Sequence, residues 1–203
     1  MNSVHLLAAA AISAAISLVV PGAAFAANDE KLAAALQAYD AEAFDQALPV
    51  LEAASAKGHD EAQYRLGMMY RFGWGVEKDF QMAREHFMSA AKQDHPEAQS
   101  ELGKIFKDGR GIDRDYKTAA MWFEKAGMQH QGVSQLNLAR FYRSGRGVEK
   151  SSPHAWAWFS LAITNEYMDA IGHRARLQAK MSEEEIARAK EILADIKKDM
   201  APR

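Results

Sequence analysis

The feature of this sequence that most constrains its fold is an internal repeat of 36 residues. Leucine, glycine, phenylalanine and alanine each recur at this interval through three consecutive units. The aligned positions are Leu66, Leu102 and Leu138; Gly75, Gly111 and Gly147; Phe87, Phe123 and Phe159; and Ala90, Ala126 and Ala162. Ala47, Leu51 and Ala54 keep the same frame and form a partial earlier copy. A repeat of this length predicts an array of stacked supersecondary units in place of one globular core.

Each unit is predicted to be a pair of α-helices. Small and apolar residues are spaced by three and four positions over 62–70 and again over 83–91, and this spacing is helical. The first helix of the first complete unit is expected over 61–72. Each second helix is expected to begin after a residue whose side chain caps the free amides of the first turn. These capping residues are Asp79, Asp115 and Ser151 or Ser152.

A G-x-G pair separates the two helices of each unit. A phosphate-binding glycine loop would need a strand before it and a helix directly after it, whereas a helix is expected before each pair here. We therefore predict structural turns, in which the first glycine ends a helix in the left-handed conformation and the second lets the chain reverse closely. The six residues are Gly73, Gly75, Gly109, Gly111, Gly145 and Gly147.

The N-terminal 26 residues differ in composition from the rest of the chain. The uncharged apolar run Leu6–Val20 is followed by Pro21-Gly22 and by Ala24-Phe25-Ala26, which is typical of a secretory signal with an A-x-A cleavage site. The usual lysine or arginine before the apolar run is absent. A buried helix and an uncleaved anchor are the alternatives, although fifteen apolar residues are fewer than the ~20 that cross a bilayer. We expect cleavage between Ala26 and Ala27, a periplasmic or secreted protein, and no stable membrane anchor.

The composition excludes several classes of site. The chain has 203 residues, no cysteine and a formal net charge of −2, so it has neither a disulfide framework nor a thiolate for metal binding or catalysis. The balanced charge argues against nucleic acid as a partner. The seven histidines show no metal-ligand spacing. Ser89 and Lys92 spell S-x-x-K, but the S-D-N and K-T-G partners of that nucleophile motif are missing. We expect no cofactor, no metal and no enzymatic activity.

The first complete unit carries a dense set of fixed positions, namely Ala62, Leu66, Gly67, Tyr70, Gly73, Gly75, Val76, Asp79, Ala83, Phe87, Ala90 and Ala91. This set resembles the Sel-one-like repeat (SLR) family, which is related to tetratricopeptide repeats. The third unit departs most, with Ala139 for glycine and Ser151 for aspartate. The resemblance implies an all-α fold, a right-handed α-solenoid that presents a concave surface to protein or peptide partners, often in bacterial envelopes.

The expected organisation follows from the repeat and its flanks. We predict a signal peptide over 1–26, N-terminal helices with the partial repeat over 27–61, repeats over 62–97, 98–133 and 134–169, and C-terminal capping helices over 170–203. Ser182 and Glu185 form a capping-box pattern. The apolar residues after it share one helix face and would cover the last unit of the solenoid. They are Ile186, Ala189, Leu193 and Ile196.

The candidate binding surface is the face of each first helix opposite its core positions. In the first unit this face carries Tyr64, Arg65, Met68, Arg71 and Phe72; the counterparts are Ser100, Glu101, Lys104, Lys107 and Asp108, then Leu136, Asn137, Arg140, Arg143 and Ser144. We define the basic ladder as Arg71, Lys104, Lys107, Arg140 and Arg143. With Tyr64, Met68 and Phe72 nearby, the ladder is typical of a concave groove for a peptide of acidic character. A solvated helix face without a partner is the alternative.

Three functions remain open at this stage. An adaptor for a protein or peptide and a periplasmic regulator that restrains a membrane sensor differ only in their partner. An envelope protein that binds or hydrolyses glycans would need exposed carboxylates or tryptophans, but Trp122, Trp156 and Trp158 fall on or beside core positions, and only Trp74 lies in a loop. We therefore favour an exported scaffold for protein–protein interactions, of undefined oligomeric state.

Overall fold

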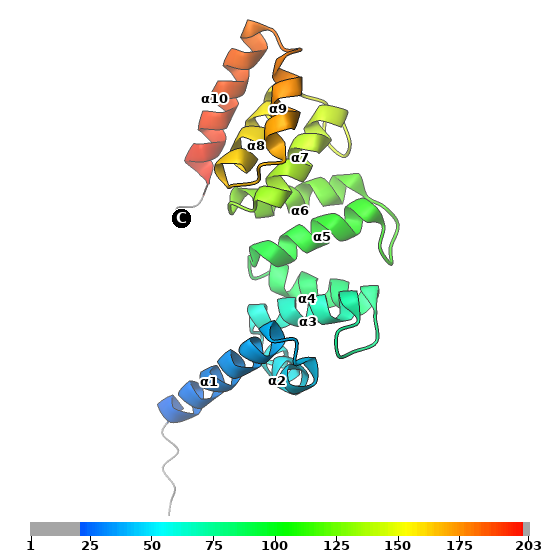
Figure 1. Ribbon diagram of the computed structural model, residues 1–203, viewed down its shortest axis with the longest axis vertical. Coiled ribbons are helices and arrows are strands. Elements are labelled where there is room, and N and C mark those ends of the chain that lie inside the picture. Colours follow the sequence, from blue (N-terminus) through cyan, green and yellow to red (C-terminus); the bar gives the residue numbers. More distant parts are fainter. Residues whose placement is uncertain (1–20, 201–203) are drawn as a thin grey trace, which may run out of the picture.

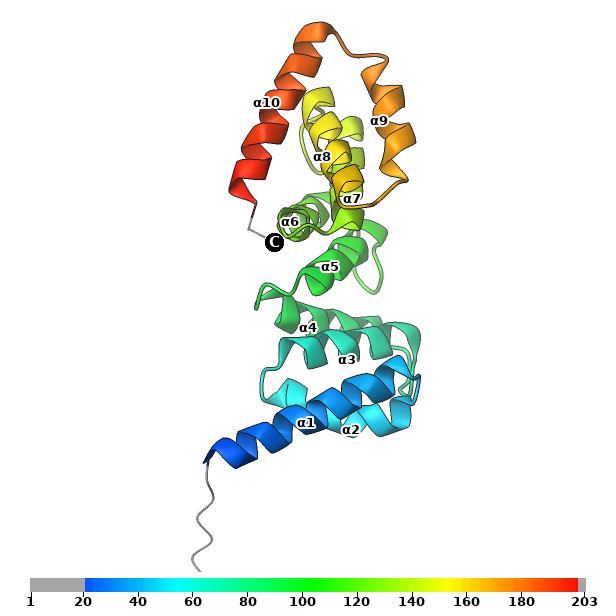
Figure 2. The ribbon, with the colours of Figure 1, turned by 60° about the vertical axis from the view of Figure 1, so that its left-hand side comes forward.

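The computed structural model describes residues 21–200, and this part of the chain is α-helical without strands (Figure 1). The helices are α1 (Pro21–Asp40), α2 (Phe44–Ala56), α3 (Asp60–Phe72), α4 (Phe80–Ala91), α5 (Pro96–Asp108), α6 (Tyr116–Met128), α7 (Gly132–Ser144), α8 (Ser152–Thr164), α9 (Ala170–Gln178) and α10 (Glu183–Asp199). Consecutive helices contact each other as far as α9, and the pairs stack into an elongated solenoid (Figures 1 and 2). The predicted fold class, an all-α solenoid of helix pairs with C-terminal capping helices, is confirmed.

The complete repeats are the pairs α3–α4, α5–α6 and α7–α8, and α1–α2 precedes them as the partial copy. The first helices α5 and α7 contact each other directly. Their side chains therefore share one surface with those of α3, which we call the first-helix face.

A phenylalanine from each second helix fills the space between the two helices of its unit. Phe87, Phe123 and Phe159 have no exposed surface. Gly67 and Gly103 lie directly against the first two of these rings, because a Cβ atom at either glycine would lie 2.6 Å from ring carbons, well inside the normal contact distance of about 3.5–4.0 Å. The repeated Leu-Gly dipeptide therefore marks a close contact between a helix and a ring.

The turn glycines adopt positive φ angles. The first glycine of each pair has φ between 71° and 78°, and its N–H donates to the carbonyl four residues earlier; these are Gly73, Gly109 and Gly145. The second has φ between 66° and 71°; these are Gly75, Gly111 and Gly147. At Gly147 a Cβ atom would overlap the carbonyl oxygen of Tyr116 in the preceding unit. This position requires both the left-handed conformation and the absence of a side chain.

The second helices begin at side-chain caps. Asp79 and Asp115 each accept hydrogen bonds from two backbone N–H groups of the following turn, and Ser151 accepts one. These bonds satisfy amides that the first turn of a helix leaves without partners. The caps and the left-handed glycines together fix where each helix of a pair stops and the next one starts.

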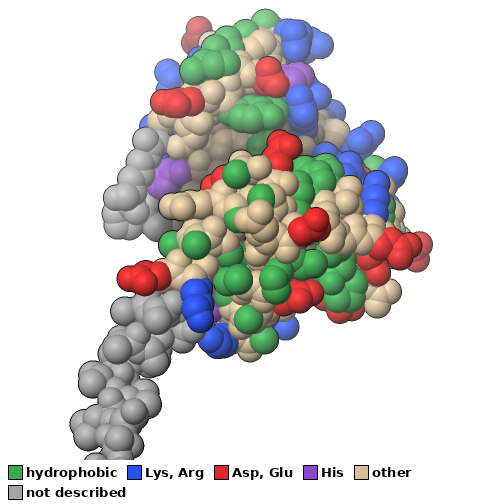
Figure 3. Space-filling model, turned by 60° about the horizontal axis from the view of Figure 1, so that its bottom comes forward, with side chains coloured by type: hydrophobic (Ala, Val, Ile, Leu, Met, Phe, Trp, Pro, Cys, Tyr) green, Lys and Arg blue, Asp and Glu red, His purple; other side chains and the backbone are tan. Residues whose placement is uncertain are grey.

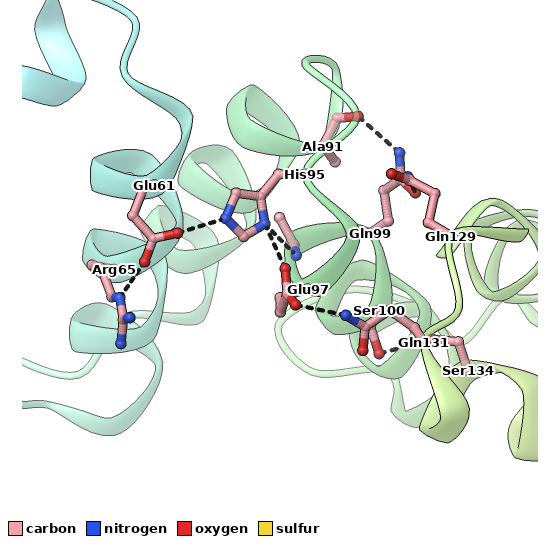
Figure 4. A network of polar contacts seen from close by, with 11 residues as sticks. Glu61, Arg65, Ala91, His95, Glu97, Gln99, Ser100, Gln129, Gln131 and Ser134 are labelled. Carbon is pink, nitrogen blue, oxygen red and sulfur yellow. Dashed lines mark hydrogen bonds and ion pairs between the residues drawn. The ribbon is translucent and has the colours of Figure 1, made fainter. Parts of the chain in front are cut away.

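Buried glutamines tie each unit to the next, and Figure 4 shows one of these junctions. Gln99 has no exposed surface; its Nε2 donates to the Ala91 carbonyl at 3.3 Å and its Oε1 accepts from Gln129 Nε2 at 2.9 Å. Gln63 and Gln135 make the equivalent two contacts in the units before and after. Because a buried amide without partners costs about 1–3 kcal/mol, these contacts hold neighbouring units in one register.

His95 forms a second polar link between units (Figure 4). Its Nδ1 accepts the Ala98 N–H at 3.3 Å, and its Nε2 lies 3.0 Å from the Glu61 carboxylate. Burial lowers the pKa of His95, but the hydrogen bond to Glu61 and the charges of Glu97 and Asp60 outweigh this effect, so the pKa is raised. In the next unit Gln131 takes the same place and donates to Glu97 at 2.6 Å.

The C-terminal helices cover the last repeat. The Ser182 and Glu185 side chains and backbones form the reciprocal capping box that begins α10. Figure 2 shows α10 lying against α8. Its contacts are made by the buried residues Ala189 and Ile192, with Leu193 half-buried beside them. Ile192 was not among the residues expected on this face.

The predicted signal peptide lies largely outside the described residues. The apolar run Leu6–Val20 is in the part of the chain that the structure does not describe, and the expected cleavage point between Ala26 and Ala27 falls within α1. From residue 21 to residue 200, none of the helices combines the length and the apolar character that a membrane span requires.

Candidate functional site

The structure divides the basic ladder into two halves with different surroundings. In the first half, Arg71 Nη1 contacts the Glu101 carboxylate, and Lys104 Nζ lies 2.7 Å from Glu101 Oε1. The side chains of Arg71, Glu101 and Lys104 are only 12%, 7% and 27% exposed. We expected these residues on an unpacked helix face, and that expectation is wrong for this half, because side chains of α3 and α5 meet here. The three residues form a buried ion-pair cluster.

The surroundings of Lys104 disfavour the charged form of its side chain. Burial, together with the positive charges of Arg71 and Arg110, lowers the pKa of Lys104 from 10.5 to about 8. The Asp108 carboxylate acts in the other direction, because a nearby negative charge favours the ammonium form. Arg71 and Lys104 share one carboxylate, that of Glu101, inside the protein, and their limited exposure leaves them less accessible to a partner.

The second half of the basic ladder lines an open pocket of about 480 Å³. Lys107, Arg140 and Arg143 contribute from α5 and α7, and Arg114 and Arg146 reach the same space from the loops that follow these helices. Figure 3 shows Lys and Arg side chains following one another along the right-hand side of the molecule. We call this space the basic pocket; its other lining residues are Asp108, Tyr116, Asn137, Phe141 and Ser144.

Positive charge in the basic pocket exceeds negative charge. Its one carboxylate, Asp108, lies 3.6 Å from Lys107 Nζ and 3.1 Å from Arg110 Nη2. Both loop arginines lie over the Tyr116 ring, with the Cζ atoms of Arg114 and Arg146 at 5.7 and 5.5 Å from its centroid. Within residues 21–200, none of the four arginines of the pocket has a carboxylate at ion-pair distance. Such a pocket is suited to bind an anion.

One repeated position explains why the two halves differ. The last basic residue of each first helix contacts the residue 30 positions later, on the helix that follows in the stack. The pairs are Arg71 with Glu101, Lys107 with Asn137 at 3.4 Å, and Arg143 with His173 at 3.3 Å. The partner is a carboxylate, then a neutral amide, then an imidazole. At the first junction the cation therefore meets a negative charge from the next helix, whereas at the next two junctions the partner from the next helix carries none.

His173, on α9, contacts two of the arginines that line the basic pocket and stacks on Phe159 with ring centroids 5.6 Å apart. Its Nε2 lies 3.0 Å from Arg140 Nη2, and its Nδ1 lies 3.3 Å from Arg143 Nη1 and 3.3 Å from Arg176 Nη2. Burial and then the three arginine charges lower the pKa of His173.

The apolar residues expected to join the groove lie elsewhere. Tyr64 stacks on His95 with centroids 4.8 Å apart, and Met68 is half-buried in the core between the first units. Phe72 is 45% exposed and stacks on Trp74 at 4.6 Å. Trp74, which we singled out as a loop tryptophan, is half-buried. None of these residues lines the basic pocket.

The sequence carries a signal for one of the two loop arginines. The middle residue of G-x-G is Trp74 in the first unit but Arg110 and Arg146 in the next two. Of these two, Arg146 lines the basic pocket, whereas Arg110 pairs with Asp108. His173 lies 36 residues after Asn137, and Arg176 lies 36 residues after Arg140, so the period also places them on this face, although the repeats predicted from the sequence ended with the third unit.

The other candidate residues from the sequence are not brought together into one site in the described part of the chain. Ser89 and Lys92 are exposed on α4, and Ser89 Oγ donates to its own helix at the Glu85 carbonyl. Trp122, Trp156 and Trp158 are buried. Over residues 21–200, no group of three histidine or carboxylate side chains is placed to hold a metal ion.

Helix pairs at a constant period, with a charged pocket on the first-helix face, define this protein as an α-solenoid. The Sel1 repeat model matches residues 60–95, 96–130 and 132–167, which together make up more than half of the chain. The protein therefore belongs to the Sel1 repeat family, as the resemblance of its first complete unit predicted. Sel1 repeat proteins are typically non-catalytic interaction scaffolds.

Two solved structures illustrate the fold. A protective antigen present in uropathogenic Escherichia coli strains, which displays an SLR fold, is 30% identical with a TM-score of 0.77; the match covers 89% of this chain but only 40% of the antigen. A Sel1 repeat protein from Oxalobacter formigenes is 23% identical with a TM-score of 0.72, and the match covers 84% of this chain and 78% of that one. No curated protein shows a significant match.

Proposed function

We propose that this protein is an exported scaffold that binds an acidic segment of a partner protein at the basic pocket. The observation that carries the proposal is the pocket itself, in which five cations and one carboxylate surround about 480 Å³. Sel1 repeats generally mediate protein interactions, and a pocket of one charge attracts and orients a segment of the opposite charge. Export is supported by the apolar run and A-x-A pattern of the first 26 residues.

The geometry favours a short extended segment with several carboxylates. Arg140 and Arg143 project from one helix, whereas Arg114 and Arg146 come from two successive loops, so a single carboxylate does not use all four. Guanidinium groups bind carboxylates through paired hydrogen bonds. Because the pocket is open to solvent, its attraction for an acidic segment decreases with salt.

The test is the affinity of a fluorescently labelled hexaglutamate peptide, measured by anisotropy at low and high salt, with hexaglutamine as the neutral control. Arg143→Ser combined with Arg146→Ser should weaken hexaglutamate binding more than about tenfold, since hydrogen bonds between charged groups contribute about 1.5–3 kcal/mol each. Both arginines are exposed, so the change in stability should stay within about 0.5 kcal/mol.

Arg84→Ser combined with Lys92→Ser is the matched control. It removes the same two positive charges from α4, where both residues line a different pocket with Met88 and Phe106. This variant should bind hexaglutamate within about twofold of the wild type, because net charge alone acts weakly at a distance in salt. Equal losses in the two double variants, or no binding by the wild type, would reject the basic pocket as the binding site.

A further inference from the structure

Three arginines surround one histidine at the C-terminal side of the basic pocket. We define the arginine–histidine node as Arg140, Arg143, Arg176 and His173. Arg140 and Arg143 belong to α7 and also line the basic pocket, whereas His173 and Arg176 belong to α9. The node therefore joins the pocket to the helix that follows the last repeat.

The node contains more hydrogen-bond donors than its own atoms can accept. A guanidinium group only donates, and a neutral imidazole has one N–H and one acceptor nitrogen. Guanidinium nitrogens nevertheless lie 3.0 to 3.3 Å from both ring nitrogens of His173. In either tautomer, the N–H of the ring faces another donor. A negatively charged acceptor resolves this conflict, because it takes hydrogen bonds from the ring and from the arginines together.

We propose that the arginine–histidine node binds a carboxylate of the acidic segment together with a proton on His173. The imidazolium then donates to the bound oxyanion and adds a fourth positive charge to the three arginines. This inference rests on the proposed function and names the group at which the segment is anchored. It also assigns a role to α9, which follows the three matched repeats.

Binding of the oxyanion and of the proton are coupled. In the free protein, burial and the charges of Arg140 and Arg143 on α7 and of Arg176 on α9 hold the pKa of His173 below 6.5, and Asp169 beside α9 opposes them. From α8 the imidazole is covered by the uncharged ring of Phe159. A carboxylate at the node raises the pKa of His173, since it stabilises the charged form. Affinity for the oxyanion therefore increases as the pH falls, by up to about tenfold if binding raises the pKa by one.

The experiment follows the His173 ring by NMR in the full chain with labelled histidine, and the His173→Gln variant identifies its signal among the seven histidines. Sodium sulfate and hexaglutamate are the probes, because sulfate does not titrate in the range of histidine and glutamate stays largely ionised above about pH 5.5. Hexaglutamate affinity is measured in parallel at about pH 5.5 and 8. His86→Gln is the matched control, since His86 on α4 also has a lowered pKa but lies outside the node.

We expect both probes to raise the pKa of His173, and hexaglutamate to bind several-fold more tightly at the lower pH. His173→Gln should abolish this pH dependence, whereas His86→Gln should keep it. An unchanged His173 pKa while hexaglutamate is bound would overturn the node and leave the proposed function standing. A sulfate-induced rise without any hexaglutamate binding would overturn the acidic segment as ligand and, with it, the anchoring role of the node.

Discussion

Replacement of Glu101 by glutamine tests the ion-pair cluster most directly. The change preserves the shape of the side chain but removes the negative charge that Arg71 and Lys104 share. Both cations would then lack a counter-charge in a place where water reaches only 12% and 27% of their side chains. An uncompensated charge of this kind destabilises the folded state strongly.

The expected magnitude follows from the cost of leaving a buried charge without its partner. Removal of one partner from a buried ion pair costs about 3–5 kcal/mol. Partial exposure of Lys104 and Arg71 reduces this cost here. We expect Glu101→Gln to lower the free energy of unfolding by about 2–3 kcal/mol, which lowers the melting temperature by about 4–12 °C in a chain of this size.

The assay is urea unfolding followed by far-UV circular dichroism, with Glu191→Gln as the matched control. Glu191 pairs with Arg188 on the surface of α10, where both side chains are about two-thirds exposed, so the control should lose less than about 1 kcal/mol. Loss of the Glu101 charge lowers the pKa of Lys104 further, so the part of the deficit that is due to Lys104 should shrink as the pH rises towards about 8 and be lost above it, where Lys104 is neutral in both proteins. If Glu101→Gln unfolds like Glu191→Gln at neutral pH, the reasoning is refuted.

Three further predictions concern other parts of the molecule. Gly147→Ala should destabilise the fold by more than about 2 kcal/mol, because its Cβ would overlap the Tyr116 carbonyl. Gly58→Ala is the control: Gly58 also has a positive φ, 92°, but open space around the Cβ, so this variant should cost only about 1 kcal/mol. Thermal melts compare the two variants. The raised pKa of His95 implies a stabilisation that is present below about pH 6.5 and lost as the pH rises through the folded value. Wild type should therefore exceed His95→Gln in unfolding free energy more at acidic than at alkaline pH, and a constant difference would contradict this. Protein from a bacterial host should begin at Ala27 in the periplasmic or secreted fraction, as checked by intact mass, and an uncleaved cytosolic chain would contradict export.

The repeat made most of the fold predictable from the sequence. Helical spacing and turn residues are local properties, so the position of α3, its end at Gly73 and the caps at Asp79 and Asp115 follow from residues within one unit. The capping box at Ser182 is local in the same way. These features depend on the chain within about four residues of each position, which a single sequence contains in full.

The candidate site was only partly predictable, because its properties depend on contacts between units. Helix phase placed the five cations of the basic ladder on one face, but it did not show that Glu101 reaches back to Arg71 across 30 residues, or that Asn137 and His173 bring no negative charge to the next two cations. The contribution of Arg114 and Arg146 depends on loop conformation. The sequence therefore indicated a basic face, and the stacking of the units determined which part of it meets a negative charge from the next helix.

Because every junction has its own glutamine contacts, the stability of one junction does not depend on how many units the solenoid contains. Gln63, Gln99 and Gln135 each bind the end of the preceding helix and an amide of their own unit, so a tandem copy of residues 96–131 would bring its own glutamine and meet the partner it needs on either side. Duplication of one unit in the gene thus lengthens the solenoid and leaves no buried glutamine amide of that unit without hydrogen-bond partners. The number of repeat units can then change one at a time, to match the length of the surface that a partner presents.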